Sequence, residues 1–414
     1  MNNQTDKGYD ADVIIIGAGP SGTVAACLLR QLGYQVTILE RSHFPRFVIG
    51  ESLLPQCLTT LEKAGCLEAI QAAGFQEKVG ATFQNKGVYE RINFADKFSS
   101  GPSTAFHVER SKFDDILAQC ATEKGSEIKF GHTVTAVDLA YGNCQISCVD
   151  ESDNETQLRA KFVLDASGYG RVLPRMLGID RPSELEPKGS LFSHVEDHID
   201  EKLHSRAETL ITTHPEHKDV WYWLISFANG RSSVGVVGSP DFLKSYQEQG
   251  IAGLKALINQ DEKLAEILGQ AEFDTQPYQM NAYSGNVSDF WGDGFAILGN
   301  AGEFLDPIFS SGVTVAMRSA DLAVSALDKQ LSGGQADWQH EFVEPLKVGV
   351  DTFKCYVNGW YDGGFQDVIY ASGSSKNVKE KIASILAGYA WDRENPYVKE
   401  PQKRLNTLVS LCQE

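Results

Sequence analysis

The chain has no run of eighteen apolar residues, so its sequence offers no candidate for a membrane-spanning helix. Its first eleven residues are polar and partly acidic, and they lack the basic and apolar stretches of a secretory signal. The eight cysteines form no CxxC pair and have no neighbouring histidines at the spacing of a zinc site. We therefore expect a cytoplasmic protein with reduced cysteines, no metal centre and no membrane association.

Positive charge is also scarce. Lys and Arg number 37 against 55 Asp and Glu, which gives a formal net charge of -18. Because such a surface repels phosphate backbones, we expect no nucleic-acid partner. The 414 residues, 42% of them hydrophobic, can bury a large core and favour either two lobes or one enlarged α/β domain.

A glycine-rich turn near the N-terminus joins an expected strand to an expected helix. The predicted order is a strand over Asp12–Gly17, a helix over Ser21–Leu32 and a strand over Gln35–Glu40. The turn reads Gly17-Ala18-Gly19-Pro20-Ser21-Gly22, which fits G-x-G-x-x-G, and the second strand ends in Glu40. This βαβ unit predicts dinucleotide binding.

Each glycine of the turn has a separate expected task. Gly17 would permit the tight turn, Gly19 would let the backbone approach a pyrophosphate, and Gly22 would let the helix pack on the strand. The helix N-terminus would offer unpaired N–H groups to the anion, and Glu40 would accept hydrogen bonds from ribose hydroxyls. The turn alone leaves NAD and FAD open.

The remaining patterns predict an α/β fold in which a Rossmann-like lobe is interleaved with a β-sheet substrate lobe and followed by a helical C-terminal region. Further helices are expected over Leu53–Ala64, Ser111–Glu123 and Val313–Leu331, and further strands over Val220–Phe227, Ser232–Val237 and Phe295–Leu298. The expected limits are 10–185 for the first part of the nucleotide lobe, 186–285 for the substrate-covering sheet, 286–332 for the return segment and 333–414 for the helical region.

Three further segments resemble the para-hydroxybenzoate-hydroxylase-like flavoproteins. They are Arg110 before a helix, Asp165-Ala166-Ser167-Gly168 after a strand, and Gly299-Asn300-Ala301-Gly302 after the late strand. The resemblance implies that the dinucleotide is FAD. This chain departs from the family in having Asn300 where aspartate is usual, although the amide can still bind a ribityl hydroxyl. With the turn residues and Glu40, the cofactor-binding set implied is Arg41, Ser52, Arg110, Val134, Asp165, Asn300, Pro307, Ser311, Gly312 and Val313.

Closer features resemble the flavin-dependent halogenases. They are Phe44-Pro45-Arg46-Phe47, then Gly50-Glu51-Ser52-Leu53-Leu54-Pro55, Lys78, and Asp306-Pro307-Ile308-Phe309-Ser310-Ser311-Gly312-Val313. In that family reduced FAD reacts with oxygen, a halide is held near the Ser-Ser-Gly turn, and hypohalous acid travels to a lysine beside the substrate. Lys78 matches that lysine and is the expected catalytic residue. A solvent-facing Lys78 is the alternative.

The halogenase signature W-x-W-x-I-P is incomplete in this chain. It appears as Trp221-Tyr222-Trp223-Leu224-Ile225-Ser226, with Ser226 in place of the proline. Trp221 and Trp223 lie on one face of a strand, where they would either wall the substrate cavity or pack in the core. The missing proline weakens the case for halogenation and leaves oxygen chemistry in place.

These features favour an FAD monooxygenase that oxidises an electron-rich aromatic ring, as do similar flavoproteins that modify a tryptophan of a precursor protein during quinone cofactor maturation. The expected partners are an aromatic substrate, free or bound to a protein or carrier, and a separate flavin reductase. The alternatives are a halogenase of a phenol, pyrrole or indole, an FAD-dependent isoprenoid reductase, and a flavin-binding module without enzymatic activity.

Overall fold

The computed structural model describes residues 8–281, 283–371 and 375–413. Most of the first eleven residues, in which no secretory signal is expected, therefore lie outside the described residues. None of the helices described is long and apolar enough to cross a membrane.

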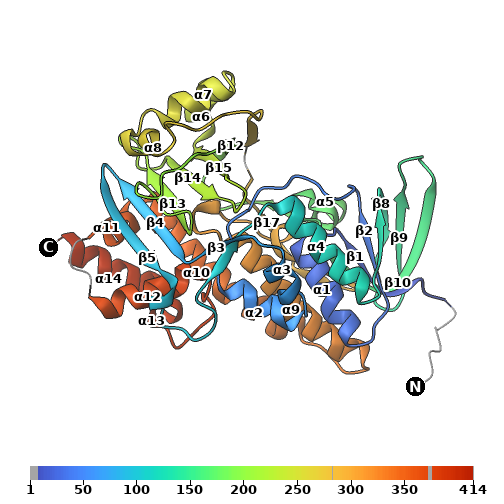
Figure 1. Cartoon of the computed structure of the whole chain (residues 1–414). Coiled ribbons are helices and arrows are strands. Elements are labelled where there is room, and N and C mark those ends of the chain that lie inside the picture. The colour runs from blue at the N-terminus through green and yellow to red at the C-terminus, as the bar shows by residue number, and fades with distance from the viewer. Residues whose placement is uncertain (1–7, 282, 372–374, 414) are drawn as a thin grey trace.

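The first lobe is built on a sheet with the strand order β18-β19-β10-β1-β2-β7. Strands β1, β2 and β10 of this sheet are labelled in Figure 1. Its parallel strands are β1 (Ala11–Ile16), β2 (Val36–Glu40), β7 (Glu127–Phe130), β10 (Glu155–Asp165) and β19 (Phe295–Ile297). Antiparallel pairing adds β18 (Trp291–Gly292), β9 (Cys144–Val149) and β8 (Thr133–Asp138). The apolar, β-branched β1 is almost wholly buried, as expected for a central parallel strand.

Helices cover this sheet and complete the lobe. They are α1 (Pro20–Gln31), α2 (Gln56–Lys63), α3 (Leu67–Ala72), α4 (Arg110–Glu123), α5 (Val172–Met176) and α9 (Ser311–Leu331). The Rossmann-like α/β lobe expected from the sequence is confirmed. The helix expected from Leu53 begins later, at Gln56, because Pro55 fixes the conformation of the turn before it.

A second, mostly antiparallel sheet forms the substrate lobe, with the order β16-β12-β15-β14-β13-β4-β5. Its strands are β16 (Tyr278–Asn281), β12 (Gly189–Glu196), β15 (Arg231–Gly238), β14 (Trp221–Ser226), β13 (Glu208–Thr213), β4 (Gly80–Asn85) and β5 (Val88–Asn93). Helices α6 (Pro240–Gln247), α7 (Ile251–Ile258) and α8 (Glu262–Ile267) lie on one side of it, at the top of Figure 1.

The two faces of β14 belong to different parts of the core. Tyr222 and Leu224 pack in the cluster formed with α6, α7 and α8, whereas Trp221, Trp223 and Ile225 belong to the large cluster shared with the first lobe. This division follows from the two-residue period of a strand. The tryptophans therefore face the space between the lobes.

Two strands of the second sheet come from the first part of the chain. β4 pairs in parallel with β13, so residues 80–93 extend the substrate sheet although they precede α4 of the first lobe. Because residues 80–93 belong to the second sheet, a single boundary at residue 186 does not separate the two lobes. Two short ladders lie between the lobes, one of β3 (Gln76–Lys78) with β6 (Ala105–His107) and one of β11 (Asp180–Pro182) with β17 (Gly285–Val287).

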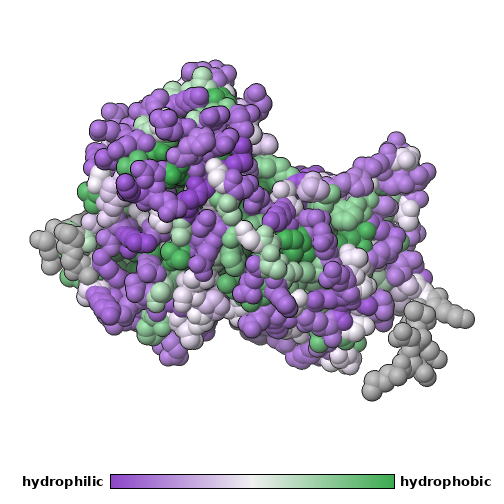
Figure 2. All heavy atoms as spheres, viewed as in Figure 1, coloured by the Kyte–Doolittle hydropathy of each residue, from purple (hydrophilic) through white to green (hydrophobic). Residues whose placement is uncertain are grey.

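The C-terminal region is helical, as expected, and packs beside β4 and β5. It comprises a π-helical turn (Gln339–Val343), α10 (Glu344–Tyr361), α11 (Gly364–Tyr370), α12 (Lys376–Leu386), α13 (Pro396–Lys399) and α14 (Pro401–Gln413). Trp360 of α10 lies against Phe83 of β4, with ring centroids 5.5 Å apart. Figure 2 shows a largely hydrophilic face, with hydrophobic atoms gathered near the middle, where the lobes meet.

Candidate active site

A groove runs along the carboxyl edge of the first sheet, where α/β folds bind nucleotides. Its floor is the turn between β1 and α1. Gly17 has a φ of +100°, and a Cβ there would lie 2.6 Å from the carbonyl oxygen of Ala166. A Cβ on Gly22 would lie 2.0 Å from the carbonyl oxygen of Gly17. A Cβ on Gly19 would meet only the Arg46 side chain, 3.9 Å away, so its space is open toward the groove.

Glu40 closes the groove beside this turn. It is buried, and its carboxylate accepts hydrogen bonds from the backbone N–H groups of Ala18 (2.9 Å) and Ser42 (2.9 Å). These bonds hold the carboxylate at the end of β2, next to the N-terminus of α1. Of the remaining predicted cofactor residues, Pro20, Ser21, Arg41, Val134, Arg110 and Asn300 also line the groove.

Arg110 stands where the groove continues into a deeper cavity. Its guanidinium donates to both carboxylate oxygens of Asp114, at 2.8 and 3.0 Å, and to the carbonyl of Ile49 at 3.0 Å. It lines both spaces, as do Pro20, Tyr169 and Asn300. The groove and the cavity therefore adjoin each other at these residues.

Asp165 lies behind the groove rather than on its wall. Its two carboxylate oxygens accept hydrogen bonds from the backbone N–H groups of Ser167 (2.8 Å) and Leu173 (2.7 Å). Burial raises the pKa of this carboxyl group. The groove itself is lined by Ala166, Ser167 and Gly168, so Asp165 shapes the turn that presents them.

A deep cavity lies between the two lobes. Trp221, Trp223, Ile211, Ile225 and Ile308 give it an apolar wall. Pro307, Gly312 and Val313 line it at the start of α9, whereas Ser311 is buried beside them and is not among the described lining residues. Both predicted tryptophans therefore wall the cavity.

The indole N–H groups of Trp221 and Trp223 both have hydrogen-bond partners. Trp223 Nε1 donates to Ser233 Oγ at 3.0 Å, and Trp221 Nε1 donates to the hydroxyl of Tyr361 at 2.9 Å. Tyr361 donates in turn to Asp306 Oδ2 at 2.9 Å. Burial raises the pKa of Asp306 to about 6. These bonds fix the two rings and connect Trp221 to the Asp306 turn.

Lys78 lies one side chain behind the cavity wall. It is buried, with 1% of its surface exposed, which rules out the solvent-facing alternative. Its Nζ donates to Ser52 Oγ at 2.7 Å and to the carbonyl of Leu53 at 3.1 Å. Loss of hydration lowers the pKa of Lys78 to about 7. Ser52 does line the cavity, so Lys78 reaches it through that hydroxyl.

Sequence reasoning did not identify Glu51 as a site residue. Glu51 lines the cavity with 1% exposure, and its Oε1 lies 2.6 Å from His194 Nε2. Its Oε2 is buried without a hydrogen-bond partner among the described residues. A buried acceptor of this kind needs an N–H or O–H partner, which a bound ligand or a water molecule would supply. The motif Gly50-Glu51-Ser52 had pointed to this segment, but not to the carboxylate.

Sequence reasoning also missed His107 and Thr209. Thr209 lines the cavity, and its Oγ1 lies 2.9 Å from Ser52 Oγ and 2.9 Å from His107 Nε2. The two residues lie on different strands, β6 and β13, far from any recognisable motif. Their proximity could be found only from the fold.

The residues present fit a flavin dinucleotide. The open space at Gly19 and the N-terminus of α1 suit a diphosphate. Arg110 and Asn300 stand where the groove becomes the cavity, in the position for a linker between two ring systems. The free Oε2 of Glu51 would accept a hydrogen bond from a ring N–H.

Comparisons with known proteins agree with this geometry. The FAD binding domain family matches residues 10–340. A 1H-pyrrole-2-carbonyl-(peptidyl-carrier protein) chlorinase of Pseudomonas fluorescens is 30% identical over 343 residues, covering 76% of this chain and 75% of the relative. A brominase of the same carrier-bound substrate, from Pseudoalteromonas luteoviolacea, is 31% identical over 348 residues, covering 81% and 80%.

Solved structures of flavin-dependent proteins are also similar to this chain. A flavoprotein/dehydrogenase from Cytophaga hutchinsonii is 40% identical, with a TM-score of 0.93, covering 97% of this chain and 98% of that one. The flavin-dependent brominase Bmp2 is 25% identical, with a TM-score of 0.83, covering 96% and 99%. This chain therefore belongs to the FAD-binding family of flavin-dependent halogenase-like oxidoreductases.

Proposed function

We propose that this enzyme is a monooxygenase that inserts one oxygen atom from O₂ into an electron-rich aromatic ring. The observation that carries the proposal is the cavity walled by Trp221 and Trp223, which adjoins the dinucleotide groove and has Ser52 among its lining residues. When bound and reduced, FAD supplies the activation of O₂. The protein supplies the enclosed apolar space and the hydrogen-bond donors around it.

The cavity residues have distinct tasks in this proposal. Trp221 and Trp223 exclude water and hold a flat ring, because their own rings are fixed by hydrogen bonds to Tyr361 and Ser233. Lys78 orients the hydroxyl of Ser52 and balances negative charge that develops near it. Lys78 is therefore a positioning residue that acts through Ser52.

In its finer form, the proposal is that the ring is the indole of a tryptophan in a precursor protein. A ladder of aromatic rings supports this form. Phe47 and Tyr278, both about 40% exposed, stack with centroids 4.1 Å apart. The ladder continues through Phe192 to Trp223 on the cavity wall. This row of rings connects an exposed aromatic pair, on which a side chain of a partner protein would stack, with the wall of the cavity.

Halogenation is the second candidate, and the two pyrrole halogenases at 30 and 31% identity favour it. Ser226 at the position of the signature proline favours oxygenation. The two reactions need the same cofactor site, so only the product distinguishes them.

The test is a product assay with reduced FAD supplied by an added flavin reductase. Free indole, phenol and pyrrole, and a peptide containing one tryptophan, are incubated with ¹⁸O₂ in the presence and absence of bromide. We expect ¹⁸O in the product regardless of bromide, with the peptide giving a higher kcat/KM than free indole. Bromine in the product would replace the proposal by the second candidate, and no product from any ring would overturn both.

A further inference from the structure

Four buried side chains form a continuous hydrogen-bonded chain beside the cavity. Lys78 Nζ lies 2.7 Å from Ser52 Oγ, which lies 2.9 Å from Thr209 Oγ1, which lies 2.9 Å from His107 Nε2. The other ring nitrogen of His107, Nδ1, lies 3.0 Å from the carbonyl oxygen of Ser226. The two hydroxyls in the middle, of Ser52 and Thr209, line the cavity, and His107 is fully buried behind them.

The backbone holds these groups in register. β3, which carries Lys78, pairs with β6, which carries His107. Ser52 forms an isolated antiparallel bridge with His107, and Thr209 follows the first residue of β13. Main-chain hydrogen bonds fix β3, β6 and β13, so the fold sets the distances between the side chains that these strands carry.

The direction of every hydrogen bond follows from one acceptor. A carbonyl oxygen only accepts, so Nδ1 of His107 carries a hydrogen and donates it to Ser226. Burial and the Lys78 charge lower the pKa of His107 well below its ordinary value, so the ring is neutral and Nε2 is free to accept. Thr209 then donates to Nε2, Ser52 donates to Thr209, and Lys78 donates to Ser52. All the hydrogens point toward His107.

We propose that Ser52, Thr209 and His107 form a base relay that removes the proton from the aromatic ring after it has been substituted. This inference rests on the proposed function. The carbon that receives the oxygen or the halogen still carries its hydrogen, and aromaticity returns only when that C–H bond breaks. The bonding pair goes back to the ring, and the proton goes to the hydroxyl oxygen of Thr209 or Ser52.

The relay then moves hydrogens without moving heavy atoms. As the ring proton reaches Thr209 Oγ1, the hydrogen that Thr209 already carried passes to His107 Nε2. If Ser52 accepts the proton, its own hydrogen passes to Thr209 and the hydrogen of Thr209 passes to His107. The imidazolium formed keeps its Nδ1–H bond to Ser226. It returns the proton by the same hydroxyls when the product leaves and water enters the cavity.

Glu51 is the competing base on the cavity wall. Its Oε1 is paired with His194 at 2.6 Å, whereas Oε2 is free among the described residues. Glu51 would take the ring proton directly and would not need Thr209. The two assignments therefore differ in their dependence on the Thr209 hydroxyl.

The kinetic test uses Thr209→Val, which keeps the size of the side chain and removes the hydroxyl, with Thr209→Ser as the matched control. The substrate is the ring found by the product assay, with deuterium at the reacting carbon. In Thr209→Val and His107→Gln we expect turnover to fall on the order of 10²-fold and a primary isotope effect that wild type lacks. Thr209→Ser, which keeps the hydroxyl, should recover most of the turnover lost in Thr209→Val and show no isotope effect, and all three variants should bind FAD normally.

Several outcomes would overturn the relay. Unchanged turnover in Thr209→Val, lower turnover without an isotope effect, or an isotope effect found in Glu51→Gln but not in Thr209→Val would each remove it. In these cases wild type still makes product, so the proposed function stands. If wild type makes no product at all, the proposed function fails and the relay fails with it.

A measurement on the resting protein does not depend on turnover. ¹⁵N-histidine NMR should show His107 with a protonated Nδ1 and an unprotonated Nε2, assigned by the loss of its signals in His107→Gln. The Nε2 shift should move in Thr209→Val and stay close to wild type in Thr209→Ser. A proton on Nε2 would reverse the hydrogen bonds and overturn the proposal.

Discussion

Lys78 is a buried cation beside the cavity, and its burial lowers the stability of the folded protein. In the unfolded chain an ordinary lysine keeps its proton up to a pKa of 10.5, whereas the folded chain lowers the pKa of Lys78 to about 7. Between these values the unfolded state binds more protons, so the contribution of Lys78 to stability rises with pH. Below pH 7 Lys78 is protonated in both states, so the full cost of burying its charge remains.

Replacing Lys78 with methionine should therefore stabilise the protein and impair the reaction. We expect a higher Tm than wild type at pH 6.5, by an amount corresponding to a few kcal/mol, and a difference that shrinks toward pH 9.5. Turnover should fall on the order of 10²-fold while FAD stays bound. Thermal unfolding at the two pH values and product assays check this, and a variant that loses stability and activity together would show a structural role alone.

Gly19 offers a test of the groove. A side chain there meets only Arg46 at 3.9 Å, so Gly19→Val should fold normally and block the diphosphate. Gly22→Val should instead lower the Tm, because its Cβ would overlap the carbonyl of Gly17 at 2.0 Å. Absorbance after gel filtration measures retained flavin. A yellow Gly19→Val protein would contradict the placement of the diphosphate.

Sequence motifs predicted the position of individual residues on their elements. Gly17 and Gly22 flank the start of α1, Glu40 ends β2 and Arg110 begins α4, whereas their contacts with FAD stay a prediction. The position of Lys78 behind Ser52 could not be predicted from the sequence, because the contacts of a side chain depend on the tertiary fold. His107 and Thr209 belong to no motif at all.

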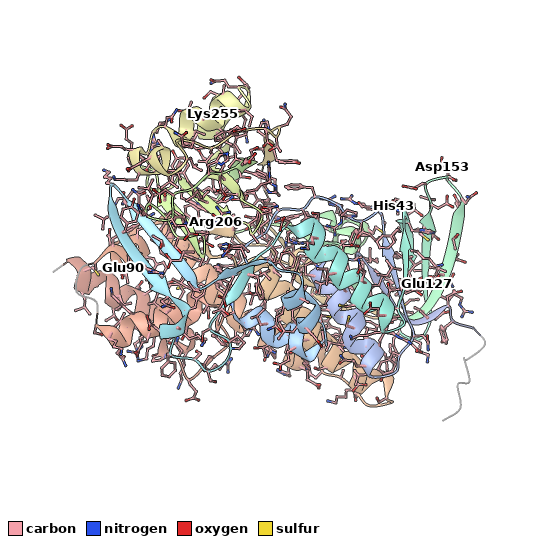
Figure 3. All side chains as sticks on the ribbon, viewed as in Figure 1. His43, Glu90, Glu127, Asp153, Arg206 and Lys255 are labelled. Atoms are coloured by element: carbon pink, nitrogen blue, oxygen red, sulfur yellow. The ribbon has the colours of Figure 1, made fainter. Side chains whose placement is uncertain are left out.

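A hydrogen-bonded network around the carboxylate of Asp197 connects the ends of four strands in the substrate sheet. Asp197, just after β12, accepts from Arg206 Nη1 at 2.6 Å and from Ser232 Oγ on β15 at 2.6 Å. Arg206, labelled in Figure 3, precedes β13 and also donates to the carbonyl of Phe227, just after β14. The Ser226 hydroxyl lies 3.0 Å from Ser232 Oγ. Ser226, which replaces the signature proline, is therefore part of this hydrogen-bonded network.

Asp197→Ala should loosen this end of the sheet. The Arg206 guanidinium would lose its buried partner, and we expect a loss of about 3 kcal/mol in the free energy of unfolding. FAD binding should persist, because the groove lies in the other lobe. Chemical denaturation followed by fluorescence measures the change, with exposed Glu248→Ala as control. Equal stability of the two variants would show that the hydrogen-bonded network around Asp197 contributes nothing to the free energy of unfolding.

Local composition predicted elements such as α1, β14 and α9, because α1 and α9 contain alanine-rich stretches and β14 is a short run of aromatic and aliphatic residues. The partners of strands were less predictable. β4 has the composition of an ordinary strand, and its parallel pairing with β13 joins residues more than a hundred positions apart. Pairing of this kind depends on the packing of the whole chain, which no local pattern records.

We expect a separate flavin reductase to supply electrons to this enzyme, as its resemblance to the flavin-dependent halogenases implies. We expect NADH added without oxygen to leave the flavin absorbance unchanged over many minutes, and an added flavin reductase to bleach it. Rapid bleaching by NADH alone would show that the enzyme reduces its own cofactor.

The exchange of β4 and β5 between lobes limits how the gene can be divided. A fragment ending at residue 185 would carry β4 without β13, and the freed edge would invite pairing between copies. The complementary fragment would lack the last two strands of its own sheet. Expression of either half alone should therefore yield insoluble material, so engineering of the cavity has to proceed in the intact polypeptide.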